Sequence, residues 1–302
     1  MPEGPIKHLS YSQISTYMIC GLRYKFQYVD LIPPAFTASS LVFGQAIHEA
    51  VGALYEQHML GDTLRPDEMV DVYRQAWQSR DGAEIRFFNG DNEQSLREKA
   101  QQMLSVFHES FDPSTQVLGI EEFFEVQLAP EVPPLHGYID LIEQSPDGRV
   151  TVADLKTCAK KPSSSQAHSN LQLTAYSIGA GELGFDPDEL TLRLDCVTKT
   201  KNPELVRYDT TRTAEQRNRF VKLVKQIWSA IEHHAFFPRE DWSSWIQLSR
   251  ARTMIPCSTS PSKPDPCLTN SVTQKAPRGP NHNLRYSSIA FTANLSTRSF
   301  SG

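Results

Sequence analysis

The sequence predicts a mixed α/β fold, in which a helical N-terminal part precedes a mixed central sheet flanked by helices. Up to about residue 111, apolar residues recur at the spacing of amphipathic helices. From residue 116 onward they alternate with polar residues, as they do in half-buried strands. Two further helical patterns, at 170–181 and 213–235, then flank one more alternating segment at 190–200. Helices that follow and interrupt strands in this way pack on the faces of a sheet.

The N-terminal part contains four expected helices, at 9–29, 41–55, 65–80 and 92–111. Ser10 or Ser12 would cap the first helix, because a serine hydroxyl accepts a hydrogen bond from a free backbone N–H of the first turn. Gly21 weakens this helix and marks a place where it can bend. His48 lies beside the apolar stripe of the second helix, where both a structural and a ligand role are open.

The second part contains four expected strands and two helices. Residues 135–143 and 149–157 read as a hairpin, because Ser145-Pro146-Asp147-Gly148 between them is a turn sequence. The other strands are expected at 116–129 and 190–200, and the helices at 170–181 and 213–235.

Composition limits the classes of protein that the chain can belong to. The 302 residues carry a net charge of -5, which argues against a protein that coats nucleic acid non-specifically. No apolar run reaches the roughly 18 residues of a membrane span. Neither a secretory signal nor a disulfide framework is apparent, since the five cysteines are irregularly spaced. We therefore expect a cytoplasmic protein without a membrane segment.

The last part of the chain differs from the rest. Residues 249–302 are rich in Ser, Thr, Pro and Asn and show no sustained period. Beyond residue 250, basic side chains outnumber acidic ones. These features predict a disordered basic tail, which can assist nucleic-acid binding or serve only as a solvated extension.

Two aspartates and a lysine in the predicted hairpin suggest a chemical site. Asp154 and Lys156 are two apart on one strand, so their side chains project from the same face. Asp140 comes from the neighbouring strand and can point to the same place. Carboxylates are the ligands that Mg²⁺ and Mn²⁺ prefer, and a lysine beside them can stabilise charge on a phosphate. The pattern favours a metal-dependent nuclease, although an Asp-x-Lys alone also occurs as exposed charges at a strand end.

A glutamine and a tyrosine on the following helix can complete this site. Gln172 and Tyr176 are four residues apart and therefore share one helix face. Their helix follows the Asp-x-Lys strand through a Ser-rich loop, so its start can face the same side. The alternative is a plain surface helix.

Five short motifs in order resemble one known family. They are Ser12-x-x-x-x-Tyr17-x-x-Cys20-x-x-x-Tyr24-x-x-x-Tyr28, Gly44-x-x-x-His48, Gly137-Tyr138-Ile139-Asp140, Asp154-Leu155-Lys156 and Gln172-x-x-x-Tyr176. Each is weak alone, but together, over about residues 9–240, they resemble the RecB-like branch of the PD-(D/E)XK nuclease superfamily. The first resembles the start of the nuclease domains of AddB and of CRISPR adaptation exonucleases.

The resemblance implies a fold, a site and an activity. It implies a restriction-endonuclease-like core and a nuclease domain over 1–248, with a helical part at 9–112 and a catalytic core at 113–248. Metal ligands would be His48, Asp140, Asp154 and the backbone carbonyl of Leu155, and the metal would be Mg²⁺ or Mn²⁺. Lys156 would be the catalytic lysine, with Gln172 and Tyr176 completing the site.

The implied activity is hydrolysis of phosphodiester bonds in DNA by an exonuclease, often on single strands or ends. Such an enzyme would serve DNA repair, recombination or phage and defence DNA processing, and a separate helicase subunit is a possible partner.

One departure from the resembling proteins concerns an iron–sulfur cluster. Relatives with a cysteine at the place of Cys20 often hold such a cluster with three further cysteines near the C-terminus, since four thiolates are the usual requirement. Here Cys257 and Cys267 lie in the tail, and Cys158 and Cys196 are expected to be core residues. We therefore expect no cluster.

Three alternatives remain open at this point. The chain could be a non-catalytic DNA-binding subunit of a helicase–nuclease complex, although binding alone does not need metal ligands. It could be a restriction-type endonuclease with the same chemistry. A metal oxygenase built on His136 and Asp140 is remote, because nothing marks the second histidine that such a site requires.

Overall fold

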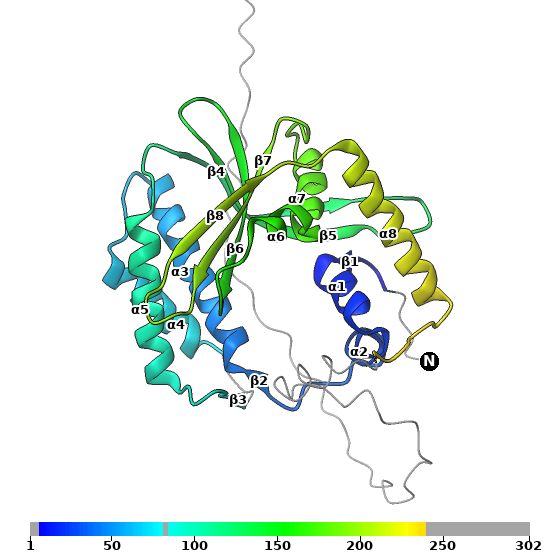
Figure 1. Ribbon diagram of the computed structural model, residues 1–302, viewed down its shortest axis with the longest axis horizontal. Helices are drawn as coiled ribbons and strands as arrows, with labels where there is room; N and C mark the ends of the chain where they lie inside the picture. The colour runs from blue at the N-terminus through cyan, green and yellow to red at the C-terminus, as the bar shows by residue number, and fades with distance from the viewer. Residues whose placement is uncertain (1–5, 81–83, 240–302) are drawn as a thin grey trace, which may run out of the picture. The chain divides into compact units, whose positions relative to one another are not determined.

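The computed structural model describes residues 6–80 and 84–239 (Figure 1). Its helices are α1 (Tyr11–Ile19), α2 (Gly21–Tyr24), the π-helical turn η1 (Lys25–Val29), α3 (Ser39–Met59), α4 (Pro66–Gln78), α5 (Glu93–Glu109), α6 (Ser164–Ser169), α7 (Leu171–Glu182) and α8 (Ala214–Glu232). Its strands are β1 (Leu9–Ser10), β2 (Thr37–Ala38), β3 (Ile85–Arg86), β4 (Gln116–Val126), β5 (Leu135–Gln144), β6 (Val150–Cys158), β7 (Thr191–Thr198) and β8 (Leu205–Thr210).

The main sheet is mixed. Its strand order is β1-β5-β6-β7-β8, and β4 pairs with β5. The pairs β1/β5 and β6/β7 are parallel, whereas β4/β5, β5/β6 and β7/β8 are antiparallel. The predicted fold class, a mixed sheet flanked by helices with a helical N-terminal part, is thus confirmed.

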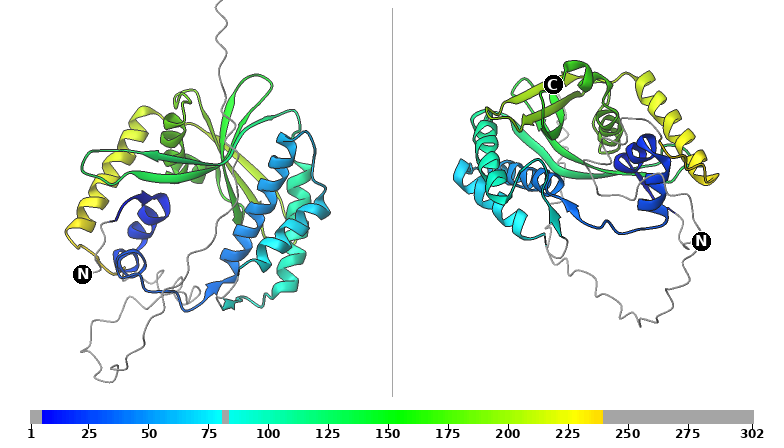
Figure 2. Two further views of the ribbon diagram at one scale, coloured as in Figure 1. Left: turned by 180° about the vertical axis from the view of Figure 1, so that it is seen from behind. Right: turned by 60° about the horizontal axis from the view of Figure 1, so that its bottom comes forward.

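Helices cover the sheet in two groups, each with its own apolar core. The group α3, α4 and α5 lies on one side in Figure 1, and α1, α7 and α8 lie on the other (Figures 1 and 2). Phe43, Leu54 and Phe107 belong to the first core, where they pack against Leu141 and Leu155 of the sheet. The second core consists of apolar side chains of α1, α7 and α8 packed against those apolar side chains of β5, β6 and β7 that do not belong to the first core.

Strand β5 divides one of its edges between two partners, which opens a fork in the sheet. Leu135 and His136 pair with β1, and Leu141–Gln144 pair with β6. Between them, the segment 137–140 has no strand partner on this edge among the described residues. Beyond Ala153, β6 continues beside β7 alone. Ile139 and Leu141 pack into different cores, so β5 twists strongly at Asp140, which lies at the fork.

The first predicted helix, 9–29, was wrong as a single element. Leu9 and Ser10 form β1, and the helix breaks at Cys20, whose backbone is extended. Ser10 is the cap of α1: its hydroxyl accepts from the N–H of Gln13. The break coincides with a close chain approach, since a Cβ on Gly21 would lie 3.0 Å from the backbone nitrogen of Phe237.

The later elements agree with the sequence patterns except at two places. The Ser-rich loop after β6 contains the short helix α6, and the unpredicted strand β8 closes the sheet beyond β7. Strand β8 has no buried residue to mark it, and its pairing with β7 supplies its hydrogen bonds instead.

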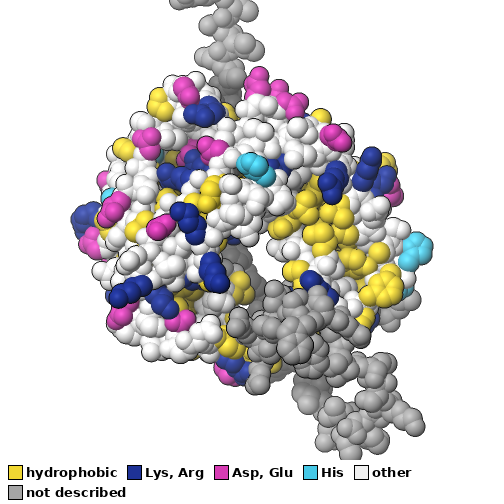
Figure 3. Space-filling view, viewed as in Figure 1, with side chains coloured by type: hydrophobic (Ala, Val, Ile, Leu, Met, Phe, Trp, Pro, Cys, Tyr) yellow, Lys and Arg dark blue, Asp and Glu magenta, His cyan; other side chains and the backbone are white. Residues whose placement is uncertain are grey.

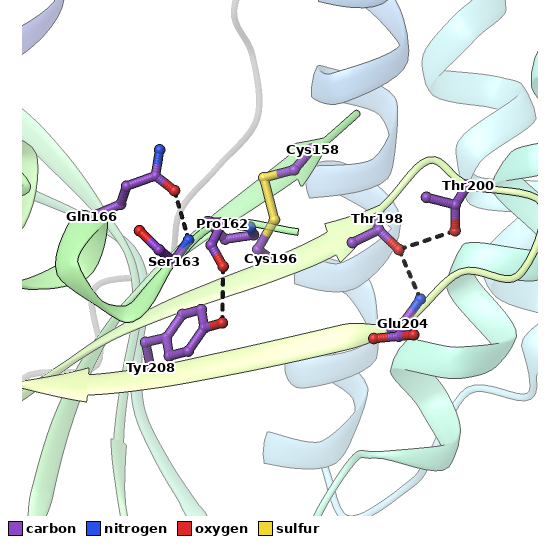
Figure 4. Close-up of a disulfide and its surroundings, with 9 residues drawn as sticks. All are labelled: Cys158, Pro162, Ser163, Gln166, Cys196, Thr198, Thr200, Glu204 and Tyr208. Carbon is purple, nitrogen blue, oxygen red and sulfur yellow. Dashed lines mark hydrogen bonds between the residues drawn. A yellow bond between two sulfur atoms is a disulfide. The ribbon is translucent and has the colours of Figure 1, made fainter. Parts of the chain in front are cut away.

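The expectation for Cys158 and Cys196 needs correction. Cys196 is a fully buried core residue, but its sulfur is bonded to that of Cys158 in a disulfide between β6 and β7 (Figure 4). Their separation of 38 positions in the sequence gave no sign of this proximity, whereas the parallel pairing of the two strands places their Cα atoms 6.2 Å apart.

Two further expectations touch the limits of the described residues. None of the helices within 6–80 and 84–239 is long and apolar enough to cross a membrane. The predicted tail, 249–302, lies outside these residues, as do Cys257 and Cys267.

Candidate active site

Asp140 occupies the fork between β5 and β6. One of its oxygens, Oδ2, accepts a hydrogen bond of 2.8 Å from the backbone N–H of Leu155. In a continuous antiparallel ladder a backbone carbonyl of β5 would accept this hydrogen bond. The carboxylate therefore satisfies an N–H that the separation of the strands leaves free, and the same separation gives Asp140 access to a pocket.

Asp154 and Lys156 lie side by side on β6. The ammonium of Lys156 donates to Oδ1 of Asp154 at 2.7 Å. The side chain of Asp154 is 0% exposed and that of Lys156 is 38% exposed. The second oxygen of Asp154, Oδ2, is buried and has no hydrogen-bond partner. Buried carboxylate oxygens are normally hydrogen-bonded, so this unpartnered oxygen marks the site.

The pKa values in this group reflect burial among like and opposite charges. Burial raises the pKa of Asp154 to about 7; Lys156 opposes the rise and Asp140 adds to it. For Lys156, burial alone would lower the pKa, but Asp154 and Asp140 outweigh it and the pKa is raised. The lysine is therefore a persistent cation beside two carboxylates. Strong perturbation of this kind is common at functional sites.

A hydrogen-bonded chain connects α7 to Asp140. The amide nitrogen of Gln172 donates to the hydroxyl of Tyr176 at 3.0 Å, and that hydroxyl donates to Oδ1 of Asp140 at 3.0 Å. Burial raises the pKa of Tyr176 well above its usual value, with Asp140 contributing. The phenol therefore remains protonated and acts as a donor.

Two glycines allow α7 to approach the sheet closely enough for this chain. A Cβ on Gly137 of β5 would lie 2.5 Å from the ring of Phe124, and a Cβ on Gly179 of α7 would lie equally close to the same ring. Phe124, on β4, is thus enclosed between the two backbones. This packing fixes α7 one turn beyond Tyr176, which explains the glycine in the Gly137-Tyr138-Ile139-Asp140 motif.

The start of α7 is held by a buried arginine. Arg212 donates to the carbonyls of Ala167 and Asn170 and to the hydroxyl of Thr174. The side chain of Asn170 caps the helix by accepting from the N–H of Gln172. These contacts fix the first turn of α7, and with it Gln172.

His48 reaches the fork from α3. Its Nδ1 lies 3.7 Å from Oδ2 of Asp140. Burial lowers its pKa; Asp140 opposes this and Lys156 adds to it. A lowered pKa favours the neutral imidazole, which is the form that binds metals. The six predicted side chains and Leu155 therefore lie together around the fork between β5 and β6. Their roles in metal binding and catalysis remain predictions.

Two residues of this place were missed in the sequence. Tyr11, at the start of α1, interacts electrostatically with Asp154 and Lys156, and burial raises its pKa. Glu121 lines the same pocket as His48 and Asp140. Burial raises its pKa and Asp140 adds to the effect. Its φ of 48° marks an irregularity in β4 opposite Asp140. No local pattern reveals the helix packing that places Tyr11 or the strand register that places Glu121.

The donor set suits a hard divalent cation, although it is not a ready-made metal cage. Within the described part of the chain, no three His, Cys, Asp or Glu side chains are already gathered closely enough to form a complete metal cage. Mg²⁺, however, is usually bound by one or two carboxylates together with waters and substrate phosphates. The unpartnered Oδ2 of Asp154 and the carboxylate of Asp140 fit that mode of binding.

The surface around the site is uneven in chemistry. In Figure 3, Lys and Arg side chains on the left-hand part of the face are interspersed with Asp and Glu side chains. Hydrophobic side chains gather on the right-hand part, towards α8.

The whole chain was compared with known proteins. A model of the PD-(D/E)XK nuclease superfamily matches residues 8–252. No curated protein matches. A solved structure described as a "putative exonuclease", from Eubacterium rectale, aligns at 9% identity and a TM-score of 0.46, covering 90% of this chain and 91% of that one. The structure of SSO0001 aligns at 11% identity and a TM-score of 0.37, covering 74% and 76%. Because the family model spans most of the sequence, the chain belongs to the PD-(D/E)XK nuclease superfamily, whose substrates are nucleic acids.

Proposed function

We propose that the protein is a metal-dependent DNA exonuclease of the RecB-like branch, which hydrolyses phosphodiester bonds in single strands or at ends. The observation that carries this proposal is the buried, unpartnered Oδ2 of Asp154 beside Asp140 and Lys156. A carboxylate that is buried without full compensation costs stability. A structural role does not account for it, whereas a cation-binding role does.

Mg²⁺ or Mn²⁺ would be held by Asp140, Asp154, the carbonyl of Leu155 and His48. A cation bound there would supply charge neutralisation at the phosphate and a water of lowered pKa. Hydrolysis requires that a water oxygen attack phosphorus, that the bond to the leaving oxygen break, and that this oxygen receive a proton.

The remaining residues orient groups and stabilise charge. Lys156 remains protonated, and its partly exposed ammonium can donate to a phosphate oxygen as negative charge develops there. Tyr176 and Gln172 hold one oxygen of Asp140 in place, and the Leu155 N–H holds the other. Asp140 therefore has a fixed orientation before substrate binds, which reduces the reorganisation that catalysis requires.

The motif order supports the RecB-like assignment, because His48 and the Gln172–Tyr176 pair accompany the two aspartates and the lysine. We further propose that the substrate is DNA rather than RNA and that the enzyme is an exonuclease rather than an endonuclease. A separate helicase partner and a role in repair, recombination or defence are also parts of this proposal.

The test is cleavage of three DNA forms by the purified protein, with Mg²⁺ or Mn²⁺ and with chelator. Linear and single-stranded DNA should be degraded, and closed circular DNA should persist. Lys156→Ala should abolish cleavage without loss of folding. Cleavage of closed circles would indicate a restriction-type endonuclease, and binding without any cleavage would indicate a non-catalytic subunit.

A further inference from the structure

Four aromatic rings form a continuous row along β4, β5 and the residue that directly precedes β1. The rings of His8 and His136 stack with centroids 4.4 Å apart and planes 4° apart. Phe123 packs edge-on against His136, and its centroid lies 5.3 Å from that of Tyr138. We call these residues the aromatic row: His8, Phe123, His136 and Tyr138.

The row leads to the candidate site along one strand. His136 and Tyr138 occupy alternate positions of β5, so their side chains project from the same side of the strand. Tyr138 is two residues from Asp140, about 7 Å along the strand, next to the point where β5 twists into the fork. Phe123 pairs directly with Tyr138 across β4 and β5 and widens the row.

The fold does not require these rings to be aromatic. The core side of this hairpin is filled by Phe124, Leu135 and Ile139, which are all buried. Tyr138 and Phe123 are 60% and 44% exposed and rank among the exposed large apolar side chains of the described residues. Exposed rings that adjoin one another and a site are a feature of binding surfaces.

We infer that the aromatic row is a stacking platform for the bases of a single-stranded nucleic acid that enters the site. This inference rests on the proposed function and adds the residues that would bind the bases of a single strand. Base–aromatic stacking is available only where bases are unpaired, and it tolerates any sequence because every base has a π-face. A paired duplex would present its phosphates to the row instead.

The charges on the row favour stacking over phosphate binding. The carboxylate of Glu125 lies 2.6 Å from Nε2 of His136, and Glu121 lies opposite Asp140 in the register of β4 and β5. Carboxylates repel a phosphate backbone but do not hinder the approach of a neutral base. A second protein molecule is the competing occupant, and continuity with a nuclease site favours the nucleic acid.

The experiment measures binding of two fluorescent 12-mers to the full chain in EDTA, one of oligo-dT and one abasic with the same phosphates. Tyr138→Ala and Phe123→Ala should each weaken binding of oligo-dT by about tenfold. Both should leave binding of the abasic strand unchanged. Tyr138→Trp should restore the affinity for oligo-dT, since it restores a ring. Phe237→Ala is the matched control, because Phe237 is an exposed aromatic, at 74%, beside α2.

The outcomes separate this inference from the proposed function. Equal losses of affinity for the oligo-dT and the abasic 12-mer, or no loss for either, would overturn the stacking platform. A change of oligomeric state in Tyr138→Ala, seen by gel filtration, would assign the row to contact with a second copy. Hydrolysis of bis(p-nitrophenyl) phosphate, a diester without bases, tests the site alone. Its absence in the wild type would refute the proposed nuclease function. The binding measurements would still decide whether the aromatic row is a stacking platform.

Discussion

Two clusters of buried charges lie on neighbouring strands of the same sheet, and they differ in one respect. The closed network consists of Glu143, Arg193 and Asp195, on β5 and β7. The open cluster consists of Asp140, Asp154 and Lys156, on β5 and β6. Both combine carboxylates with a cation, and both are largely removed from solvent. They differ in whether every polar atom has a partner.

In the closed network every nitrogen of the cation donates to a carboxylate. Arg193 donates to both oxygens of Asp195, at 2.7 and 3.0 Å, and also to Glu143. Burial alone would lower the pKa of Arg193, but Asp195 and Glu143 raise it. Two-point pairing of this kind is the strongest geometry available to an arginine and a carboxylate. The network therefore stabilises the fold and has no free group for chemistry.

In the open cluster two carboxylates likewise accompany one cation, but Oδ2 of Asp154 has no hydrogen-bond partner. The rise in the pKa of Asp154 to about 7 records the cost of that arrangement. Residue type and burial thus do not separate these two charge clusters, whereas the unpartnered carboxylate oxygen does.

The largest expected effect is on catalysis. Asp154→Asn should reduce DNA cleavage by at least about 10³-fold, because it removes a charge on which the proposed transition-state stabilisation depends. It should not lower the melting temperature, because an incompletely compensated buried charge is lost. The control is Asp209→Asn, an exposed carboxylate on β8. A large loss of stability in Asp154→Asn would show that this aspartate is structural.

The closed network should respond in the opposite way. Asp195→Asn should lower the free energy of unfolding by about 3–5 kcal/mol, because it removes the two-point partner of a buried guanidinium and leaves Glu143 to compensate its charge alone. Urea denaturation followed by circular dichroism measures this, again beside Asp209→Asn. An unchanged midpoint would mean that Arg193 is adequately solvated without its partner and that the contrast between the clusters is false.

A smaller effect should follow from removing one hydroxyl. Tyr176→Phe should reduce cleavage by about 10- to 100-fold, the usual range for groups that orient a metal ligand. The ring should continue to pack in the core, so stability should change little. Leu171→Ala on the same helix is the comparison for packing. Wild-type rates in Tyr176→Phe would show that the Leu155 N–H alone orients Asp140.

The smallest effect should come from the edge of the closed network. Arg207 lies 3.6 Å from Asp195 and its side chain is 33% exposed. Solvent-exposed pairs contribute about 0–1 kcal/mol, so Arg207→Met should change the free energy of unfolding by less than about 1 kcal/mol. A loss as large as that of Asp195→Asn would make Arg207 a full member of the network.

Much of the fold was predictable where the pattern is local. The helical periodicity of α3 to α5 and α8, and the turn that joins β5 to β6, follow from neighbouring residues. Strand β1 was not predictable, because two residues acquire their conformation only by pairing with Leu135 and His136. The break at Cys20 and the Cys158–Cys196 bond likewise depend on segments far apart in the chain.

In the candidate site, too, only the features that depend on local spacing could be predicted. Asp154 and Lys156 were recognisable because an i, i+2 relation on a strand fixes their common side. The place of His48 followed only from a resemblance, and the structure brings it to Asp140 from a separate helix. Glu121 and Tyr11 depend on register and on helix packing, which leave no trace in local spacing. The unpartnered oxygen of Asp154 is a property of the folded molecule alone.

The most direct test of the metal-dependent site at the fork is a calorimetric titration of Mn²⁺ into the wild type, Asp154→Asn and Asp209→Asn. Saturable binding should occur in the wild type and in Asp209→Asn, and should be lost in Asp154→Asn. Identical titrations of the wild type and Asp154→Asn, or no binding in any of the three, would contradict the assignment of Asp140 and Asp154 as the metal-binding carboxylates.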